Sequence, residues 1–267
     1  MKFAKLQAAG NDFIIMEASE TVGVELDTLA KEVCHRQFGI GADGLMVLVD
    51  HEEFCEMLFY NSDGSLAKMC GNGLRCFVKY IVETRKIKEK TFDVKTPAGF
   101  YRVTVIDHSY KTSRISIDMG EVEPYAYLSE KQVSLKIGSK VYPGTVVNMG
   151  VPHLVVYYWP DDEETISLGP KLEKDDRFSE GVNVNFVKVI SDSEVVIKTW
   201  ERGAGLTLAC GTGACASASV LKEADLIGSD VKLRAPGGDL HVKLDKKNVT
   251  LTGDAVLIAI GDYIKEV

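Results

Sequence analysis

The chain has few cysteines, no long apolar run and no excess of basic residues, and each shortage excludes a class of protein. Its 267 residues contain 6 cysteines, too few for a scaffold built on disulfides. No apolar run approaches the roughly 18 residues of a membrane span, the longest being short stretches such as 255–260. With 31 basic against 39 acidic residues the net charge is −8, so we expect no nucleic-acid partner and no anionic membrane surface.

What is present describes an ordinary globular protein. Hydrophobic residues make up 45% and charged residues 26% of the chain, a balance that excludes disordered and fibrous classes. The first residues, 1–6, carry two lysines but lack the apolar middle region of a signal peptide. We therefore expect a cytoplasmic protein with reduced cysteines, and at this length either one large domain or two of about 130 residues each.

Short strands dominate the predicted secondary structure. Stretches rich in Val, Ile, Phe and Tyr and bounded by turn residues indicate strands at 13–16, 45–49, 100–106, 114–118, 146–148, 154–158, 182–189, 194–199, 231–234, 240–244 and 255–260. Helical periodicity covers 26–37, the segment after Cys70, and about 212–224. The polar segment 121–129, which contains Pro124, is the candidate domain boundary.

An internal repeat connects the two halves of the chain. Cys70-Gly71-Asn72-Gly73 opens one predicted helix and Cys210-Gly211-Thr212-Gly213 opens another, which indicates two similar halves. Both cysteines would lie at a helix N-terminus, where unpaired backbone N–H groups and the helix dipole stabilise a thiolate. The glycines allow close approach of a ligand, whose carboxylate the amides can bind. If the halves face each other, one thiol can remove a proton and the other can donate one, as in a two-base racemase.

Other cofactor and metal sites fit the sequence less well. Cys34, Cys55, Cys76 and Cys215 lack the glycine framework, and we interpret them as packing residues. The spacings within 70–76 and 210–215 are unsuited to zinc, because a helix turns the second thiol away, so no metal is expected. The segment 39–44 has the spacing of a dinucleotide-binding loop, but a predicted helix precedes it and a strand follows, which is the reverse of the required order.

A few polar residues beside glycines or strand ends are further candidates. Asn11, Asn61 and Asn183 are each compatible with a turn or a ligand contact. Arg202, which follows Glu201, has a planar fork that could hold a carboxylate. His153, after a proline, is compatible with a structural or a catalytic role.

Taken in order, these motifs resemble the diaminopimelate epimerase family over nearly the whole chain. The matching blocks are 10–13, 39–45, 59–65, 69–77, 150–153, 181–183 and 201–216. The resemblance implies an α+β fold of two similar domains, each a β-barrel-like sheet around a central helix. Residues 1–120 would carry Cys70 and residues 121–267 would carry Cys210, with the question left open whether the last strand packs back on the first half.

The resemblance also implies roles for individual residues and no cofactor. Cys70 and Cys210 would be the acid and base thiols that convert LL-diaminopimelate into meso-diaminopimelate, on the route to lysine and cell-wall precursors. The amides of Gly71-Asn72 and Gly211-Thr212 would bind the α-carboxylate. The remaining matches are Asn61, Asn183 and Arg202 for the distal carboxylate, Glu201 for the distal amino group, and Asn11 and His153 as further active-site positions. Family members are often dimers, so a homodimer acting on a small-molecule amino acid is implied.

Three departures from the family pattern leave a related racemase as an alternative function. The family usually has His-Gly-Leu where this chain has Gln7-Ala8-Ala9, an asparagine at Val151 and a glutamate at Leu206. Because polar sites reject poorly matched substrates strongly, such changes could indicate a different amino acid, such as histidine. A pyridoxal-dependent racemase would need a Schiff-base lysine, and no lysine lies in a site-like setting. A dithiol redox protein and a non-enzymatic binding protein are the alternatives from other classes.

Overall fold

The computed structural model describes residues 1–85, 87, 89–246 and 248–265 and divides into two compact units. Unit 1 comprises Met1–Asp118 and the chain from Thr252 onward, and unit 2 is Met119–Leu251. The chain leaves unit 1 within strand β8 (Thr112–Glu121) and returns to it within β18 (Asn248–Asp262). Within the described ranges, no helix combines the length and the apolar character that crossing a bilayer would need.

In its described residues, unit 1 is a mixed sheet with two α-helices. Its other strands are β1 (Lys2–Ala8), β2 (Asn11–Glu17), β3 (Gly44–Asp50), β4 (Cys55–Asn61), β5 (Leu66–Ala67), β6 (Thr91–Thr96) and β7 (Gly99–His108). Its helices are the 3-10 turn η1 (Ala18–Thr21), α1 (Leu26–Cys34) and α2 (Gly71–Arg85). β18 pairs with both β1 and β8, so the last strand of the chain belongs to this sheet.

Unit 2 has the same kinds of element. Its strands are β9 (Glu123–Pro124), β10 (Gln132–Ile137), β11 (Lys140–Asn148), β12 (Pro152–Val156), β13 (Asn183–Ser191), β14 (Glu194–Glu201), β15 (Gly205–Thr207), β16 (Asp230–Ala235) and β17 (Gly238–Asp245). Its helices are α3 (Asp162–Glu173) and α4 (Gly211–Glu223). The predicted boundary segment contains β9, which pairs with the end of β11.

The two units repeat one order of strand pairing. In unit 1, β2 pairs in parallel with β3, β3 and β4 are antiparallel, and β4 pairs in parallel with β6. In unit 2, β12 pairs in parallel with β13, β13 and β14 are antiparallel, and β14 pairs in parallel with β16. The short strands β5 and β15 precede α2 and α4 at equivalent places. The prediction of two similar halves is confirmed.

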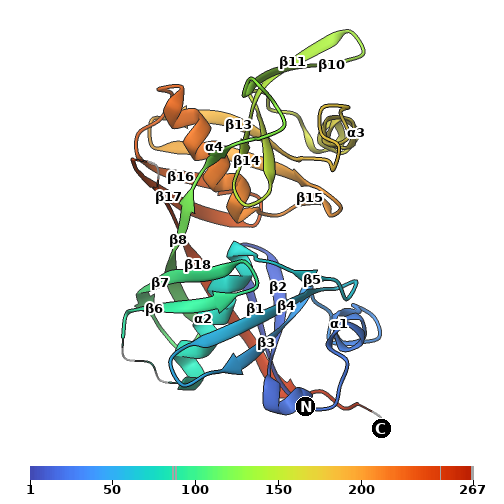
Figure 1. The fold of residues 1–267 in the computed structure, drawn as a ribbon, viewed down its shortest axis with the longest axis vertical. Coiled ribbons are helices and arrows are strands. Elements are labelled where there is room, and N and C mark those ends of the chain that lie inside the picture. Colours follow the sequence, from blue (N-terminus) through green and yellow to red (C-terminus); the bar gives the residue numbers. More distant parts are fainter. Residues whose placement is uncertain (86, 88, 247, 266–267) are drawn as a thin grey trace. The chain divides into compact units, whose positions relative to one another are not determined.

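Each unit has one helix at its centre (Figure 1). Residues Gly71–Lys79 of α2 are all buried, and so are Gly213–Ala218 of α4. A helix buried all round lies inside a core and does not cover a surface. α2 packs against β1 and β2, and α4 packs against β11, β12, β13, β16 and β17. The predicted α+β class, with a sheet around a central helix in each half, is confirmed.

Helix α1 ends earlier than the sequence predicts. The periodicity predicted a helix over 26–37, but α1 stops at Cys34. The carbonyl of Val33 accepts hydrogen bonds from the amides of Ile40 and Gly41, both at 2.9 Å. Gly39 allows this turn back onto the helix, because a Cβ there would lie 2.2 Å from the Glu32 carbonyl oxygen. The loop amides thus cap the helix at the point where it would otherwise continue.

Helix α3 was not predicted from the sequence. Asp161 caps it, with the amide of Glu164 donating to the Asp161 carboxylate at 2.7 Å. Leu168 and Leu172, one turn apart, bury its apolar face in the core of unit 2. Helix α3 packs against β13, β14 and β15, and so lies next to the strands that carry the candidate residues of this unit.

Candidate functional site

In unit 1, Cys70 caps the central helix α2 with both its carbonyl and its sulfur. The Cys70 carbonyl accepts a hydrogen bond from the Leu74 amide at 2.7 Å, and its Sγ accepts one from the Gly73 amide at 3.4 Å. The side chain is partly exposed. The thiol therefore lies where the first amides of the helix favour a negative charge, as the Cys-Gly-Xaa-Gly pattern indicated.

The structure brings Asn11 and Asn72 together beside this helix start. The Asn72 Nδ2 donates to Asn11 Oδ1 at 3.2 Å, although the two residues are 61 positions apart. Asn72 is 1% exposed, and its Oδ1 accepts from Nη2 of the buried Arg75 at 2.7 Å. Asn11 in turn donates from Nδ2 to the carboxylate of Asp43 at 2.5 Å. Two candidate residues of unit 1 are thus members of one polar chain.

Asn61 lies at the end of β4, where a tight turn follows. Its Nδ2 donates to the Ser65 hydroxyl at 2.9 Å, and its backbone amide donates to the Ser65 carbonyl at 2.9 Å. The amide of the next residue, Ser62, donates to the Asp43 carbonyl at 3.1 Å. The turn that carries Asn61 is therefore hydrogen-bonded to Asp43, the residue that also binds Asn11.

In unit 2, Cys210 caps the central helix α4 in the same way. Its carbonyl accepts from the Ala214 amide at 2.9 Å, and its Sγ accepts from the Gly213 amide at 3.4 Å. The hydroxyl of Thr212 lies 3.4 Å from the sulfur. Unlike Cys70, this residue is buried, with 7% of its surface exposed.

Burial and a nearby carboxylate control the protonation of Cys210. Burial raises the pKa of the Cys210 thiol well above its usual value, and the negative charge of Glu201 raises it further. Hydrogen bonds from Thr212 and Gly213 act in the opposite direction but do not overcome the burial. Glu201 is held in place by the Thr207 hydroxyl, which donates to its Oε1 at 2.6 Å. The structure thus brings the candidates Glu201, Cys210 and Thr212 together.

Arg202 and Asn183 also meet in unit 2. The backbone amide of Arg202 donates to Asn183 Oδ1 at 2.9 Å, and Asn183 Nδ2 donates to the Pro152 carbonyl at 3.2 Å. The guanidinium of Arg202 donates from Nη1 to the Glu180 carbonyl at 3.0 Å. Its side chain keeps 34% of its surface exposed, so the remaining donors of the fork can reach a ligand.

His153 is fully buried and neutral. Asn185 donates from Nδ2 to the Leu154 carbonyl at 3.4 Å, and the same nitrogen lies 3.1 Å from His153 Nδ1. The Leu154 carbonyl can only accept, so the end of the Asn185 side chain that faces it must be the NH2 group. The Nδ1 of His153 therefore accepts from this group, and the proton of the imidazole is on Nε2. Burial, with a smaller effect of Arg202, lowers the pKa of His153 to about 3. Its partner Asn185 lies against the start of α4, because a Cβ at Gly213 would lie 2.3 Å from Asn185 Oδ1.

The sequence reasoning missed Asp43 and Asn185. Asp43 falls within the glycine-rich segment 39–44, where only a dinucleotide-binding loop was considered, yet its carboxylate accepts a hydrogen bond from Asn11. Asn185 follows Asn183 at a spacing of two in an apolar strand. Two polar residues on one face of a buried strand are the signal that could have identified it.

The other four cysteines fit the packing interpretation to different degrees. Cys34, Cys76 and Cys215 are buried, whereas Cys55 is half-buried and its thiol lies 3.6 Å from Asp50 Oδ1. Burial raises the pKa of Cys34 to about 12 and that of Cys55 to about 11. These two thiols therefore stay protonated near neutral pH and are weak nucleophiles.

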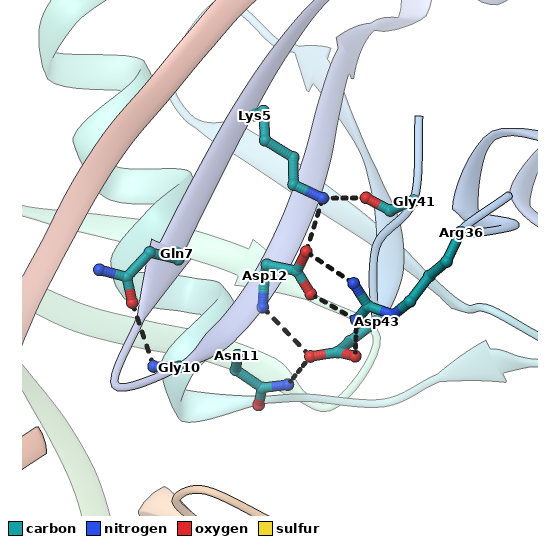
Figure 2. Close-up of polar contacts among 8 residues, drawn as sticks. All are labelled: Lys5, Gln7, Gly10, Asn11, Asp12, Arg36, Gly41 and Asp43. Carbon is teal, nitrogen blue, oxygen red and sulfur yellow. Dashed lines mark hydrogen bonds and ion pairs between the residues drawn. The ribbon is translucent and has the colours of Figure 1, made fainter. Parts of the chain in front are cut away.

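The sequence departures lie beside the candidate residues. Gln7 Oε1 accepts from the Gly10 amide at 3.1 Å, in the turn that leads to Asn11 (Figure 2). Ala8 is completely buried, whereas Val151 and Leu206 are partly exposed. Leu206 pairs with Trp200 across β14 and β15, next to Glu201. Val151 and Leu206 can therefore contact a ligand, but Ala8 cannot.

Sequence comparison gives one consistent family. The family model described as diaminopimelate epimerase matches residues 3–124 and 145–258. A diaminopimelate epimerase of Clostridium perfringens is 40% identical over 276 aligned positions, covering 99% of this chain and 100% of that protein. A diaminopimelate epimerase of Caldanaerobacter subterraneus is 39% identical, covering 98% of this chain and 99% of the other.

Solved structures share the fold at much lower identity. A probable proline racemase of Agrobacterium radiobacter superposes with a TM-score of 0.73 at 14% identity, over 99% of this chain and 93% of that one. A hydroxyproline epimerase of Agrobacterium vitis gives 0.71 at 15% identity, over 98% and 90%. At such identity the likeness shows a common fold.

Proposed function

The chain belongs to the diaminopimelate epimerase family, and from that premise we propose that it interconverts LL- and meso-diaminopimelate without a cofactor. The reaction would supply meso-diaminopimelate for lysine and for cell-wall precursors. The observation that carries the proposal, beside family membership, is the matched pair of thiols: each unit places one cysteine as the cap of its central helix. An isomerase that inverts a carbon needs one proton acceptor and one proton donor.

The two thiols would divide the proton transfer between them. One, as a thiolate, takes the α-proton from the substrate and becomes a thiol. The resulting carbanion takes a proton on its opposite face from the other cysteine, which becomes a thiolate. Atoms and charge balance, and the configuration at the carbon is inverted. Cys70 and Cys210 are the proposed pair, and the reverse reaction uses them with their roles exchanged.

Two helix N-termini would bind the α-carboxylate. The first amides of a helix have no partner within it, and they attract anions. In both units the amides three and four residues after the cysteine are used by the cysteine itself. The proposed donors are the amides before them, those of Gly71 and Asn72 in unit 1 and of Gly211 and Thr212 in unit 2. Negative charge that develops on the carboxylate during deprotonation would be stabilised there.

A second group of residues would recognise the far end of the substrate. The proposed ligands of the distal carboxylate are Asn61, Asn183 and Arg202, with Glu201 for the distal amino group. Support comes from the way Asn183 holds the backbone of Arg202 while the guanidinium stays partly exposed. Asn11 and His153 are proposed as further residues of the site. Asn11 would contact the substrate, and His153 would have a supporting role without contacting it.

The distal recognition can be tested by changing Arg202. We expect Arg202→Ala to raise KM for diaminopimelate by at least about tenfold, because a charge-assisted fork to a carboxylate is lost. Alpha-proton exchange of lysine, which lacks the distal carboxylate, should change much less. Arg177→Ala is the matched control, because Arg177 pairs with Asp175 in the same unit. Equal losses on both substrates would contradict a role for Arg202 in substrate recognition.

A related racemase is the second candidate, favoured by Val151 and Leu206, which put apolar side chains where the family usually has polar ones. Hydrogen–deuterium exchange at the α-carbon, followed by NMR in D2O with reductant, separates the two. The panel is LL- and meso-diaminopimelate, histidine, lysine and glutamate. Exchange confined to diaminopimelate supports the proposal, exchange on another amino acid instead favours the racemase, and exchange on none contradicts both.

The compartment and the assembly are also proposals. None of the six cysteines forms a disulfide, which suits a reducing cytoplasm. We also propose a homodimer, for which unit 1 offers exposed apolar residues on one face of β18: Ile258 is 55% and Ile260 is 64% exposed. Sedimentation equilibrium of the wild type and of Ile260→Glu would show a dimer that the charge weakens, and a monomeric wild type would contradict it.

A further inference from the structure

We propose that Asp43 is a positioning residue, whose carboxylate fixes the orientation of the Asn11 amide and thereby the part of the substrate site that unit 1 contributes. This inference rests on the proposed role of Asn11 in binding the substrate. Asp43 is 32 residues from Asn11 along the chain, in the loop before β3, and its side chain lies against the start of β2 (Figure 2).

The two ends of an asparagine amide are nearly equal in shape, so their partners decide which end points where. A carboxylate only accepts hydrogen bonds, so the end of Asn11 that meets Asp43 at 2.5 Å must be the NH2 group. The carbonyl end then faces Asn72, whose Nδ2 donates to it at 3.2 Å. An inverted Asn11 would place its oxygen against the carboxylate and its NH2 against another NH2, losing both hydrogen bonds.

The other end of the chain of hydrogen bonds is also charged. An arginine only donates, so the end of Asn72 that meets Arg75 Nη2 at 2.7 Å must be the carbonyl. The donors therefore run in one direction, from Arg75 through Asn72 and Asn11 to Asp43. A cation begins the chain and an anion ends it, which strengthens every bond between them. Asn11 uses one of its two N–H groups and one lone pair of its oxygen in these hydrogen bonds. Its second N–H group and second lone pair can bind a ligand.

Charged neighbours also hold the Asp43 side chain in place. Arg36 Nη2 donates to Asp43 Oδ1 at 2.7 Å and to Asp12 Oδ1 at 2.9 Å, and Lys5 lies 2.6 Å from Asp12 Oδ2. Burial alone would raise the pKa of Asp12, but hydrogen bonds from Arg36 and Lys5 outweigh it and hold the pKa below its usual value. Two anions and two cations thus form a closed cluster, which Figure 2 shows around Asp12. The Asp43 carboxylate cannot turn away without breaking it.

The backbone of Asp43 extends the same function to Asn61. Its amide donates to the Asp12 carbonyl at 2.9 Å, and its carbonyl accepts from the Ser62 amide at 3.1 Å. One residue therefore connects the start of β2, which carries Asn11, with the turn that carries Asn61. Through Asn11 and Asn72 it also reaches the start of α2, where Cys70 lies. A rigid support of this kind keeps binding groups in the productive geometry.

The test is Asp43→Asn, which keeps the shape but removes the charge and one acceptor. An asparagine at 43 has one oxygen, and Arg36, a cation that can only donate, favours that oxygen on its own side. The NH2 group of the new side chain then faces Asn11, whose amide loses its fixed orientation. We expect KM for diaminopimelate to rise about tenfold with a smaller change in kcat, the size associated with a charge-assisted hydrogen bond. Asp12→Asn is the matched control, because it removes a charge from the same cluster but leaves the Asn11–Asp43 bond in place. Equal KM increases in the two variants would overturn the proposal.

A double-mutant cycle shows whether Asp43 acts through Asn11. In an Asn11→Ala background, Asp43→Asn should raise KM no further. A general loss of structure would add the same increment in both backgrounds, and that outcome would overturn the proposal. Urea denaturation of each variant establishes that the protein compared is folded.

A readout without substrate separates this inference from the proposed function. The side-chain 15NH2 signals of Asn11, assigned by their loss in Asn11→Ala, should shift in Asp43→Asn and remain near their wild-type position in Asp12→Asn. Unchanged Asn11 signals in Asp43→Asn would overturn the positioning role, whatever the enzyme turns over. Absence of turnover in the wild type with the expected NMR shift would overturn only the diaminopimelate assignment.

Discussion

Cys70 and Cys210 begin equivalent helices in the two units, yet their surroundings differ. Both sulfurs accept from a glycine amide three residues later at 3.4 Å, and both carbonyls accept from the amide four residues later. Cys70 is partly exposed and Cys210 is buried. Next to Cys210 stand Thr212 and Glu201, whereas the corresponding place in unit 1 has Asn72, joined to Asn11. A repeated motif thus reproduces the helix cap but not the burial of the thiol or its neighbouring side chains.

The difference would serve the proposed two-thiol mechanism. A two-base epimerase needs one thiolate and one thiol at the start of each turnover. Burial and Glu201 raise the pKa of Cys210, which keeps this cysteine protonated in the free protein. The backbone cap is common to both thiols, so burial and Glu201, rather than the cap, set the pKa of Cys210 apart from its usual value.

The largest expected effect comes from removing either thiol. We expect Cys70→Ala and Cys210→Ala each to reduce epimerisation by about a thousandfold or more, because each removes one of the two proton-transfer groups. Turnover is followed by the change of configuration of LL-diaminopimelate. Cys55→Ala is the control, a half-buried cysteine that caps no helix. Near-normal turnover in either variant would refute the two-thiol mechanism.

The second expected effect concerns the side chains that pack against the third residue after each cysteine, Gly73 in unit 1 and Gly213 in unit 2. A Cβ at Gly213 would lie 2.3 Å from Asn185 Oδ1, which Thr199 and a buried setting hold fixed. A Cβ at Gly73 would lie 2.2 Å from Met46 Cε, the end of a flexible side chain. We expect Gly213→Ala to lower the free energy of unfolding by about 2–3 kcal/mol and Gly73→Ala by about 1 kcal/mol or less. The gain in helix propensity is common to both and cancels.

Urea denaturation of the two glycine variants measures this difference. Equal losses of stability would mean that Asn185 moves as readily as Met46, and that its hydrogen bonds do not hold it in a fixed position.

A third effect is the pH dependence of stability that His153 creates. Its pKa is lowered to about 3 in the folded protein, against about 6.5 in an unfolded chain. Between these values the unfolded state binds more protons, so stability falls as pH decreases from about 6.5, by up to about 1.4 kcal/mol per pH unit. We expect His153→Gln to show a shallower decline over pH 4–6.5 in denaturation experiments. His51→Gln, at the surface of unit 1, is the control, and parallel pH curves for His153→Gln and the wild type would contradict the prediction.

The sequence predicted what depends on local pattern. Both cysteine caps followed from Cys-Gly-Xaa-Gly before an apolar helix, and the repeat predicted two similar halves. Helix α3 escaped because Gly169 and Pro170 interrupt its pattern, while its stability comes from a cap at Asp161 and burial of Leu168. The end of α1 depends on amides of the loop 39–42 that return to it. Asp43 meets Asn11, 32 residues away, a contact that no local pattern encodes, whereas the spacing of two between Asn183 and Asn185 was a local signal for Asn185.

The smallest expected effect is on the protonation of Cys210 itself. Glu201→Gln keeps the shape and the acceptor for Thr207, but it removes the negative charge that raises the pKa of Cys210. The pKa should fall, so at pH 8 a larger fraction of Cys210 is thiolate and reacts with iodoacetamide. Labelling rates of the individual cysteine peptides, measured by mass spectrometry between pH 7 and 10, give Cys70 as the internal reference. We expect the rate at Cys210 to rise relative to Cys70 while burial still keeps it the slower of the two. An unchanged ratio at every pH would show that burial alone separates the two thiols, and that Glu201 has no part in their asymmetry.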